Sequence, residues 1–173
     1  MLGTTPSNVL TFLRIAMVPA FVAVLWPAKD GTSNVAAGIF WLAAVTDFVD
    51  GRLARARNEI SELGAVLDPL ADRLLVASAV ILLAWDGRLP IAAALLVLAR
   101  DLGLVVGFAV LRRMGQRPVV SPTGKVASAT IMGGLFFLLL EIPDDVGIAF
   151  FYVGVGLSLA SGLAYVRAAF RHH

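Results

Sequence analysis

The fold is decided by Thr46-Asp47-Phe48-Val49-Asp50-Gly51-Arg52-Leu53-Ala54-Arg55 and, eight residues later, by Gly64-Ala65-Val66-Leu67-Asp68-Pro69-Leu70-Ala71-Asp72. Two aspartates stand three residues apart in the first stretch and two stand four residues apart in the second. Each spacing puts both carboxylates on one face of a helix. Two neighbouring helices can therefore close a cage of four carboxylates, which predicts a divalent metal site.

Composition indicates an integral membrane protein. The chain is 59% hydrophobic and only 15% charged, with a mean hydropathy of +0.87, which is too apolar for an ordinary soluble domain. The absence of cysteine excludes a disulfide framework, a thiolate metal site and a cysteine nucleophile. At about 20 residues per crossing, 173 residues hold roughly six membrane helices and little else. We expect one all-α domain over 1–173, with apolar runs at about 9–26, 35–51, 65–85, 89–111, 124–142 and 146–166.

The basic residues predict the orientation in the membrane. With six spans both termini lie on one side, and a cytoplasmic N-terminus leaves only Lys29 and Arg88 outside. Positive charge gathers on the cytoplasmic side of membrane proteins. The second helix then runs inward to the first aspartate pair, so both pairs meet at the cytoplasmic boundary. The basic residues on the inner side are Arg52, Arg55, Arg57, Arg73, Arg112, Arg113, Arg117, Lys125, Arg167 and Arg171.

The residues around the aspartates fit phosphoryl chemistry. Four carboxylates near hydrocarbon raise one another's pKa values unless cations balance them. Two divalent ions would do so, and hard oxygen ligands favour Mg²⁺ or Mn²⁺. Gly51 and Ala54 leave room for a substrate beside the backbone, and Gly64 opens space at the start of the next helix. Arg55 is placed to hold a phosphate oxygen.

Other interpretations compete with a metal site. The aspartates could cap helices, or pair with Arg52, Arg55 and Arg73 at the interface. A small cation transporter would instead place its acidic groups near the membrane midplane, with access from both sides. A catalytically silent scaffold is a third possibility. Glycine, alanine and arginine interleaved with four aspartates on one membrane side favour the enzyme.

The eight fixed positions of these stretches resemble the signature of the CDP-alcohol phosphotransferase family. That signature has an aspartate, two residues, Asp-Gly, two residues, Ala-Arg, eight residues, a glycine, three residues, an aspartate, three residues and an aspartate. The matching residues, without a gap or substitution, are Asp47, Asp50, Gly51, Ala54, Arg55, Gly64, Asp68 and Asp72.

The resemblance implies a membrane enzyme of phospholipid synthesis with six transmembrane helices, homodimeric and open to the cytoplasm. Family members transfer a phosphatidyl or related group from a CDP-linked donor to an alcohol and release CMP. By the resemblance, Asp72 is a metal ligand and also the general base, and Asp47, Asp50 and Asp68 are the other metal ligands. The residues expected around the cytidine and diphosphate are Gly51, Ala54, Arg55 and Gly64. No nucleic-acid partner is expected.

Features within and outside the signature resemble the branch of phosphatidylglycerophosphate synthases and CDP-diacylglycerol-dependent cardiolipin synthases. They are the opening 8–14, the stretch 67–73, and Arg100-Asp101, where glycerophosphate enzymes more often carry Arg-Glu. The expected acceptor is phosphatidylglycerol, and glycerol 3-phosphate is the alternative. Candidate ligands of the acceptor phosphate are Arg14, Arg100 and Lys125. Arg14 could instead extend to the cytoplasmic face, and Arg100 and Asp101 could pair within the bundle.

Glycines spaced along the fourth and sixth runs allow helices to approach closely. Gly103 and Gly107 form a small-xxx-small pair, and Gly154, Gly156 and Gly162 lighten the sixth run. Such spacing serves either packing within one subunit or a dimer interface.

Overall fold

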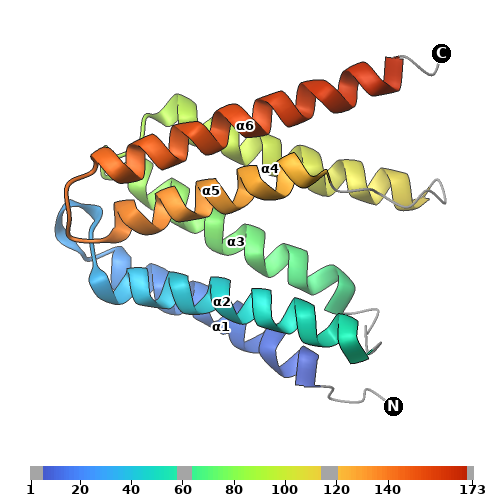
Figure 1. Cartoon of the computed structure of the whole chain (residues 1–173). Coiled ribbons are helices and arrows are strands. Elements are labelled where there is room, and N and C mark those ends of the chain that lie inside the picture. Colours follow the sequence, from blue (N-terminus) through green and yellow to red (C-terminus); the bar gives the residue numbers. More distant parts are fainter. Residues whose placement is uncertain (1–5, 58–63, 114–120, 171–173) are drawn as a thin grey trace. The chain divides into compact units, whose positions relative to one another are not determined.

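The computed structural model describes residues 6–57, 64–113 and 121–170, and over these ranges the chain is helical with no strand. Figure 1 shows the order of the helices. This confirms the all-α prediction. The elements are α1 (Pro6–Leu25), the 3-10 helix η1 (Lys29–Gly31), α2 (Asn34–Arg57), α3 (Gly64–Trp85), α4 (Ile91–Arg113), α5 (Pro122–Leu139) and α6 (Asp145–Phe170).

The chain divides into two compact units. Unit 1 holds residues 1–88 and 139–141, and therefore α1, α2 and α3. Unit 2 holds residues 89–138 and 142–173, and therefore α4, nearly all of α5, and α6.

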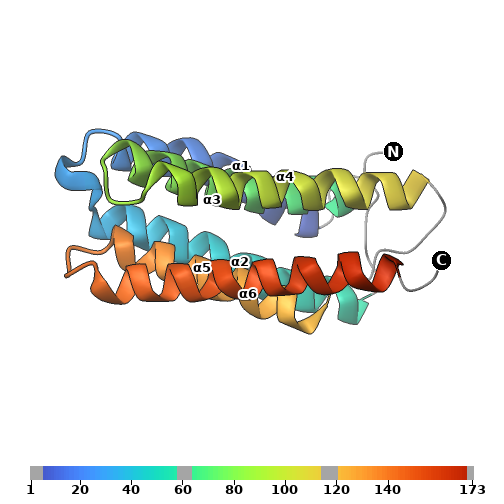
Figure 2. The same cartoon turned by 90° about the horizontal axis from the view of Figure 1, so that it is seen from above.

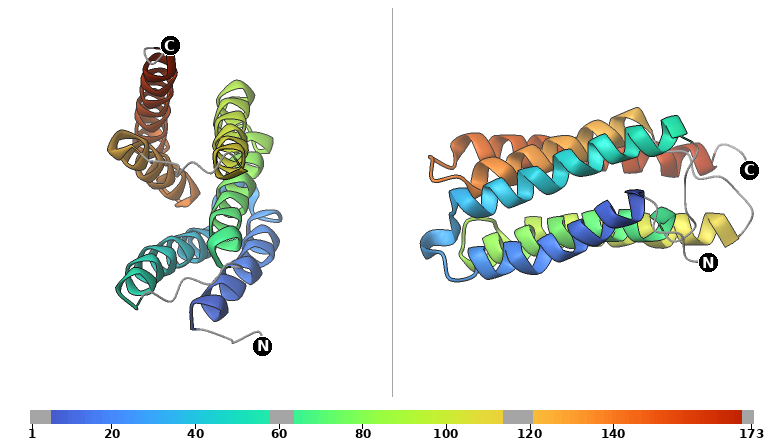
Figure 3. Two further views of the ribbon diagram at one scale, coloured as in Figure 1. Left: turned by 90° about the vertical axis from the view of Figure 1, so that its right-hand side faces the viewer. Right: turned by 90° about the horizontal axis from the view of Figure 1, so that it is seen from below.

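In unit 1, α1 packs against both α2 and α3, which touch each other less. Figures 2 and 3 show the three helices side by side and running alternately up and down. Phe21 of α1 and Phe40 of α2 are fully buried and lie with ring centroids 6.0 Å apart. Ala37 of α2 and Ala79 of α3 are also fully buried, and such small side chains allow helices to pack closely.

At one end of unit 1 the turn after α3 meets η1. Gly87 has φ +75° and closes α3 through a bond from the Arg88 amide to the Leu83 carbonyl, as in a Schellman motif. A Cβ on Gly31, where φ is +63°, would lie 2.8 Å from Asp86 Oδ2, so only glycine fits there. Burial lowers the pKa of the Arg88 guanidinium, and nearby carboxylates counteract this shift. The turn is thus a fixed element, capped and charge-balanced.

In unit 2, α5 and α6 approach until their backbones touch. A Cβ on Gly134 would lie 2.5 Å from the Phe151 amide nitrogen, and one on Gly154 would lie 2.7 Å from the Ile131 nitrogen. Of the two possibilities left open by the sequence, packing within one subunit is therefore confirmed for Gly154. An added Cβ on Gly103, Gly107, Gly156 or Gly162 would have no described atom within 4 Å, so packing within the subunit is not seen at these four glycines.

Two helical stretches are long and apolar enough to cross a membrane, within the part of the chain whose side chains are described. They are Pro122–Leu139 and Asp145–Gly162, and shorter apolar stretches occupy Leu13–Leu25 and Asn34–Thr46. Six membrane-spanning helices therefore stay a prediction.

Candidate active site

The two halves of the aspartate signature lie on adjacent helices at one end of unit 1. α2 ends at Arg57 and α3 begins at Gly64, so these two helix ends are close together in the sequence. At 1.5 Å per residue, Asp50 lies about 10 Å along α2 from its end, and Asp72 lies about 12 Å along α3 from its start. The two pairs therefore occupy similar levels on antiparallel helices (Figure 1).

Asp72 is the aspartate whose side chain the structure describes. It is half-buried in the third turn of α3 and takes part in a polar interaction. For the other signature residues the structure gives helical backbone, and their side chains lie outside its description. The predictions that fall there concern Asp47, Asp50, Gly51, Ala54, Arg55, Gly64 and Asp68. No cluster of three metal-ligating side chains occurs among the side chains that are described.

Arg14 points into unit 1 rather than to its surface. It lies in the third turn of α1, and only 2% of it is exposed. Because α1 begins at the end of unit 1 where α2 finishes, Arg14 stands about 12 Å along its helix, level with Asp72. The structure thus brings Arg14 to the signature end of the three helices.

Arg100 is the centre of a polar cluster in unit 2. Its Nη1 donates to Asp101 Oδ1 at 2.7 Å, and its Nη2 donates to Ser128 Oγ of α5 at 2.9 Å. The side chains of Arg100 and Asp101 are only 18% and 10% exposed. The sequence left open whether these charges pair or line a cavity. The structure shows the pairing, and Arg100 also borders a small apolar hollow between α4, α5 and α6. That it lines a polar substrate cavity stays a prediction.

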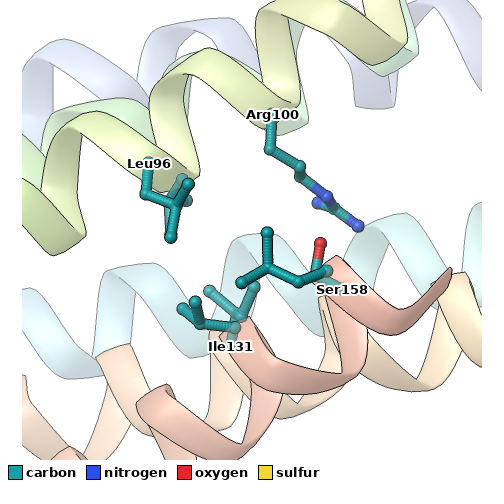
Figure 4. A pocket seen from close by; sticks show the side chains of 7 residues that line it. Leu96, Arg100, Ile131 and Ser158 are labelled. Carbon is teal, nitrogen blue, oxygen red and sulfur yellow. The ribbon is translucent and has the colours of Figure 1, made fainter. Parts of the chain in front are cut away.

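The hollow combines one charged group with apolar walls. Figure 4 shows Arg100 extending from α4 toward Ser158 of α6, with Leu96 and Ile131 on the other side. Ser158 is buried, with 9% exposed. The remaining lining residues are Val97, Val155 and Leu159. The hollow has a volume of about 10 Å³, roughly the space of one water molecule, and its exposed lining is apolar.

A second polar contact holds the start of α5, where Lys125 lies. Ser121 Oγ accepts a bond from the Gly124 amide at 3.0 Å, as an N-cap does, and lies 2.9 Å from Ser161 Oγ of α6. Lys125 is exposed one turn before Ser128, and the structure shows no ion pair between it and another described residue. Sequence reasoning missed these serines. The Ser-Pro before α5 was the available signal for the cap.

The comparison with known families decides the identity. Residues 4–160 match the family described as CDP-alcohol phosphatidyltransferase. The chain belongs to that family. As a CDP-alcohol phosphatidyltransferase family member it is a membrane-associated transferase, which removes the cation transporter from consideration.

Curated relatives of this phosphatidyltransferase carry two names. A protein of Streptomyces coelicolor named cardiolipin synthase (CMP-forming) is 40% identical over 144 residues, which cover 79% of this chain and 66% of the relative. Proteins of Shigella flexneri and Escherichia coli named CDP-diacylglycerol–glycerol-3-phosphate 3-phosphatidyltransferase are 37% identical over 172 residues, covering 94% of this chain and 93% of each relative. The chain thus spans just under two thirds of the first and nearly all of the others.

Proposed function

We propose that this protein transfers the phosphatidyl group of CDP-diacylglycerol to phosphatidylglycerol and releases CMP. The observation that carries the reaction is the family match over residues 4–160, together with an unbroken aspartate signature on adjoining ends of α2 and α3. Both names of the relatives describe phosphatidyl transfer or CMP release, so the donor is common to them. The two groups of relatives differ in the acceptor alcohol.

Two divalent cations, Mg²⁺ or Mn²⁺, fit the donor set. The set consists of carboxylates alone, spaced three and four residues apart on two helical segments at similar levels. Hard oxygen donors of this kind bind these cations in preference to softer metals. When bound, the ions would neutralise charge on the diphosphate and make CMP a better leaving group. The residues that would hold them are Asp47, Asp50, Asp68 and Asp72.

The chain's own groups would position the reactants and move the proton. The acceptor hydroxyl oxygen forms a bond to the phosphorus that carries diacylglycerol, and the bond from that phosphorus to the CMP oxygen breaks. The hydroxyl proton passes to the Asp72 carboxylate, and the electron pair of the broken bond leaves with CMP. Arg55 holds a phosphate oxygen of the donor, and Gly51, Ala54 and Gly64 leave room for the cytidine diphosphate.

Phosphatidylglycerol is favoured by the surroundings of Arg100, which we assign to the acceptor phosphate. Asp101 already neutralises part of its charge at 2.7 Å, which suits a phosphodiester with one negative charge. Glycerol 3-phosphate carries a monoester phosphate with a charge of about −1.5 to −2 at neutral pH and has no acyl chains. The side chains around Arg100 are largely apolar, and such surroundings suit a lipid acceptor better than that small polar molecule.

Glycerol 3-phosphate is the second candidate acceptor, because the relatives named for it match this chain over nearly their whole length. The relatives named for that acceptor are covered almost completely, at 93%, whereas the cardiolipin synthase is covered at 66%. Lys125, exposed at the start of α5, would then add the second positive charge that a dianion requires.

One experiment tests the reaction and the acceptor together. Purified protein in lipid, with Mg²⁺ or Mn²⁺ and CDP-diacylglycerol, should release CMP with phosphatidylglycerol. Glycerol 3-phosphate and inositol phosphate are run in parallel. D72N should abolish release while the far-ultraviolet circular dichroism spectrum stays that of the wild type, because the amide cannot accept the proton. Release of CMP with none of the three acceptors would refute the proposal.

We further propose that the enzyme has six membrane-spanning helices, both termini and the active site on the cytoplasmic side, and a homodimeric state. The apolar composition and the excess of basic residues on one side support the orientation. For the dimer, the open face of Gly103 and Gly107 on α4 is the support that the described residues offer, since nothing there fills it. Single cysteines introduced into this cysteine-free chain can be labelled from either side to test the orientation.

A further inference from the structure

We infer that Ser128 is a positioning residue for Arg100 and so sets the affinity for the acceptor. The inference rests on the proposed function, in which Arg100 binds the acceptor's phosphate. Ser128 lies on α5 and donates nothing to catalysis itself. Its hydroxyl oxygen accepts the bond from Arg100 Nη2 at 2.9 Å and thereby fixes where the guanidinium stands relative to α5.

The two partners of Arg100 act differently. Asp101 is the next residue of α4, so its bond to Nη1 moves with the helix that carries Arg100. Ser128 lies 28 residues away on another helix, and within the described part of the chain its bond is the one that ties the guanidinium across the unit. A long arginine side chain loses much rotational freedom when it is held in one geometry. The Ser128 bond supplies that restraint before the acceptor arrives.

The guanidinium of Arg100 has more N–H donors than its described partners use. A guanidinium has five N–H donors, and described side chains accept bonds from two of its nitrogens, Nη1 and Nη2. Arg100 lines the hollow with Ser158, against Leu96 and Ile131 (Figure 4). Because little of the arginine side chain is exposed, hydrogen bonds to its charge are stronger than they would be in water. If the guanidinium points in another direction, the affinity for the acceptor phosphate should therefore fall.

The test compares S128A, S128T and T130V by steady-state kinetics of CMP release, varying each substrate in turn. S128A should raise the KM for phosphatidylglycerol about tenfold, the range expected for a hydrogen bond to a charged group. Its KM for CDP-diacylglycerol should stay within about twofold of wild type. S128T keeps the hydroxyl and should recover most of the affinity. Thr130 is the matched control on the same helix, because its hydroxyl bonds only its own helix at Val126 O, 2.8 Å away.

Each outcome decides the matter. Wild-type turnover with an unchanged acceptor KM in S128A would overturn the positioning role and leave the proposed function standing. An equal rise in both KM values, or an equal effect of T130V, would also overturn it, because either indicates a general structural disturbance. If the wild type releases no CMP with any acceptor, the proposed function fails, and the positioning role fails with it.

Discussion

Replacing Gly134 by alanine tests the packing seam between α5 and α6. The new methyl carbon would lie 2.5 Å from the Phe151 nitrogen, 2.8 Å from its Cα and 2.9 Å from the Gly147 carbonyl oxygen. All three atoms belong to the backbone of α6, so no side chain can rotate away. The helices must separate, by about 1 Å, to restore ordinary contact near 3.5–4 Å.

The net effect follows from two opposing contributions. Overpacking of this kind costs about 1–3 kcal/mol. Alanine is the better helix former and returns up to about 1 kcal/mol. Separation of the helices also disturbs the neighbouring Gly154 contact with Ile131, where the spacing is 2.7 Å. The cost of overpacking minus the gain in helix propensity leaves a net loss of up to about 2 kcal/mol. Because the Gly154 contact is disturbed as well, we expect G134A to lower the free energy of unfolding by about 1–2 kcal/mol.

Thermal unfolding in detergent, followed by circular dichroism, measures the effect. G133A is the matched control, because an added Cβ at the adjacent position meets only a Phe150 ring carbon at 3.7 Å. For a chain of this size the Tm should fall by about 2–8 °C in G134A, and G133A should be equal to wild type or slightly more stable. Equal stability of the two variants would refute the close backbone approach.

Two further predictions concern the metal and the start of α5. Chelation by EDTA should abolish CMP release, and Mg²⁺ or Mn²⁺ should restore it, because four carboxylates otherwise repel one another and the diphosphate; undiminished activity after complete chelation would contradict the two-metal proposal. S121A should lower the free energy of unfolding by about 1 kcal/mol, the usual cost of losing an N-cap, since it removes the bonds to the Gly124 amide and Ser161. S78A, which loses a hydroxyl that bonds only its own helix, is the control in the same unfolding assay.

The existence of the helices could be predicted from the sequence, but their ends were displaced by a few residues. Apolar runs mark the core of each helix, whereas capping decides where it begins. α5 begins at Pro122 rather than at 124 because Ser121 caps it and proline is tolerated in the first turn. α6 begins at Asp145, one residue before the predicted run, where a carboxylate favours a helix N-terminus.

The contacts between helices could not be predicted, because they depend on how each helix is rotated. Gly154 contacts the backbone of α5, yet Gly103 and Gly107, which have the small-xxx-small spacing, face no described residue. The sequence contained no pattern that separates the two cases. The seam on α5 uses Gly134, whose neighbour Gly133 points elsewhere. Which of two adjacent glycines makes a close contact depends on where the partner helix lies.

The same reasoning explains why the signature was visible and Ser128 was not. The signature gathers its residues within two short segments, so helical periodicity alone brings them together. Ser128 acquires its role from a residue on another helix, and most hydroxyls in this fold do something simpler. Those of Thr46, Ser78 and Thr130 bond carbonyls of their own helices. A serine in an apolar helix therefore carries no signal of its partner.

Charge inside the apolar helix α4 is not explained by stability alone. A buried ion pair contributes little net stability, since apolar residues of similar volume often serve as well. Glycine contacts between α5 and α6 already fix the packing of unit 2. Such contacts cost far less free energy than removing the charges of Arg100 and Asp101 from water. What an apolar replacement could not do is present N–H donors to an anion beside hydrocarbon. In the proposed function, that capacity serves the acceptor phosphate, which would account for the cost of placing the pair there.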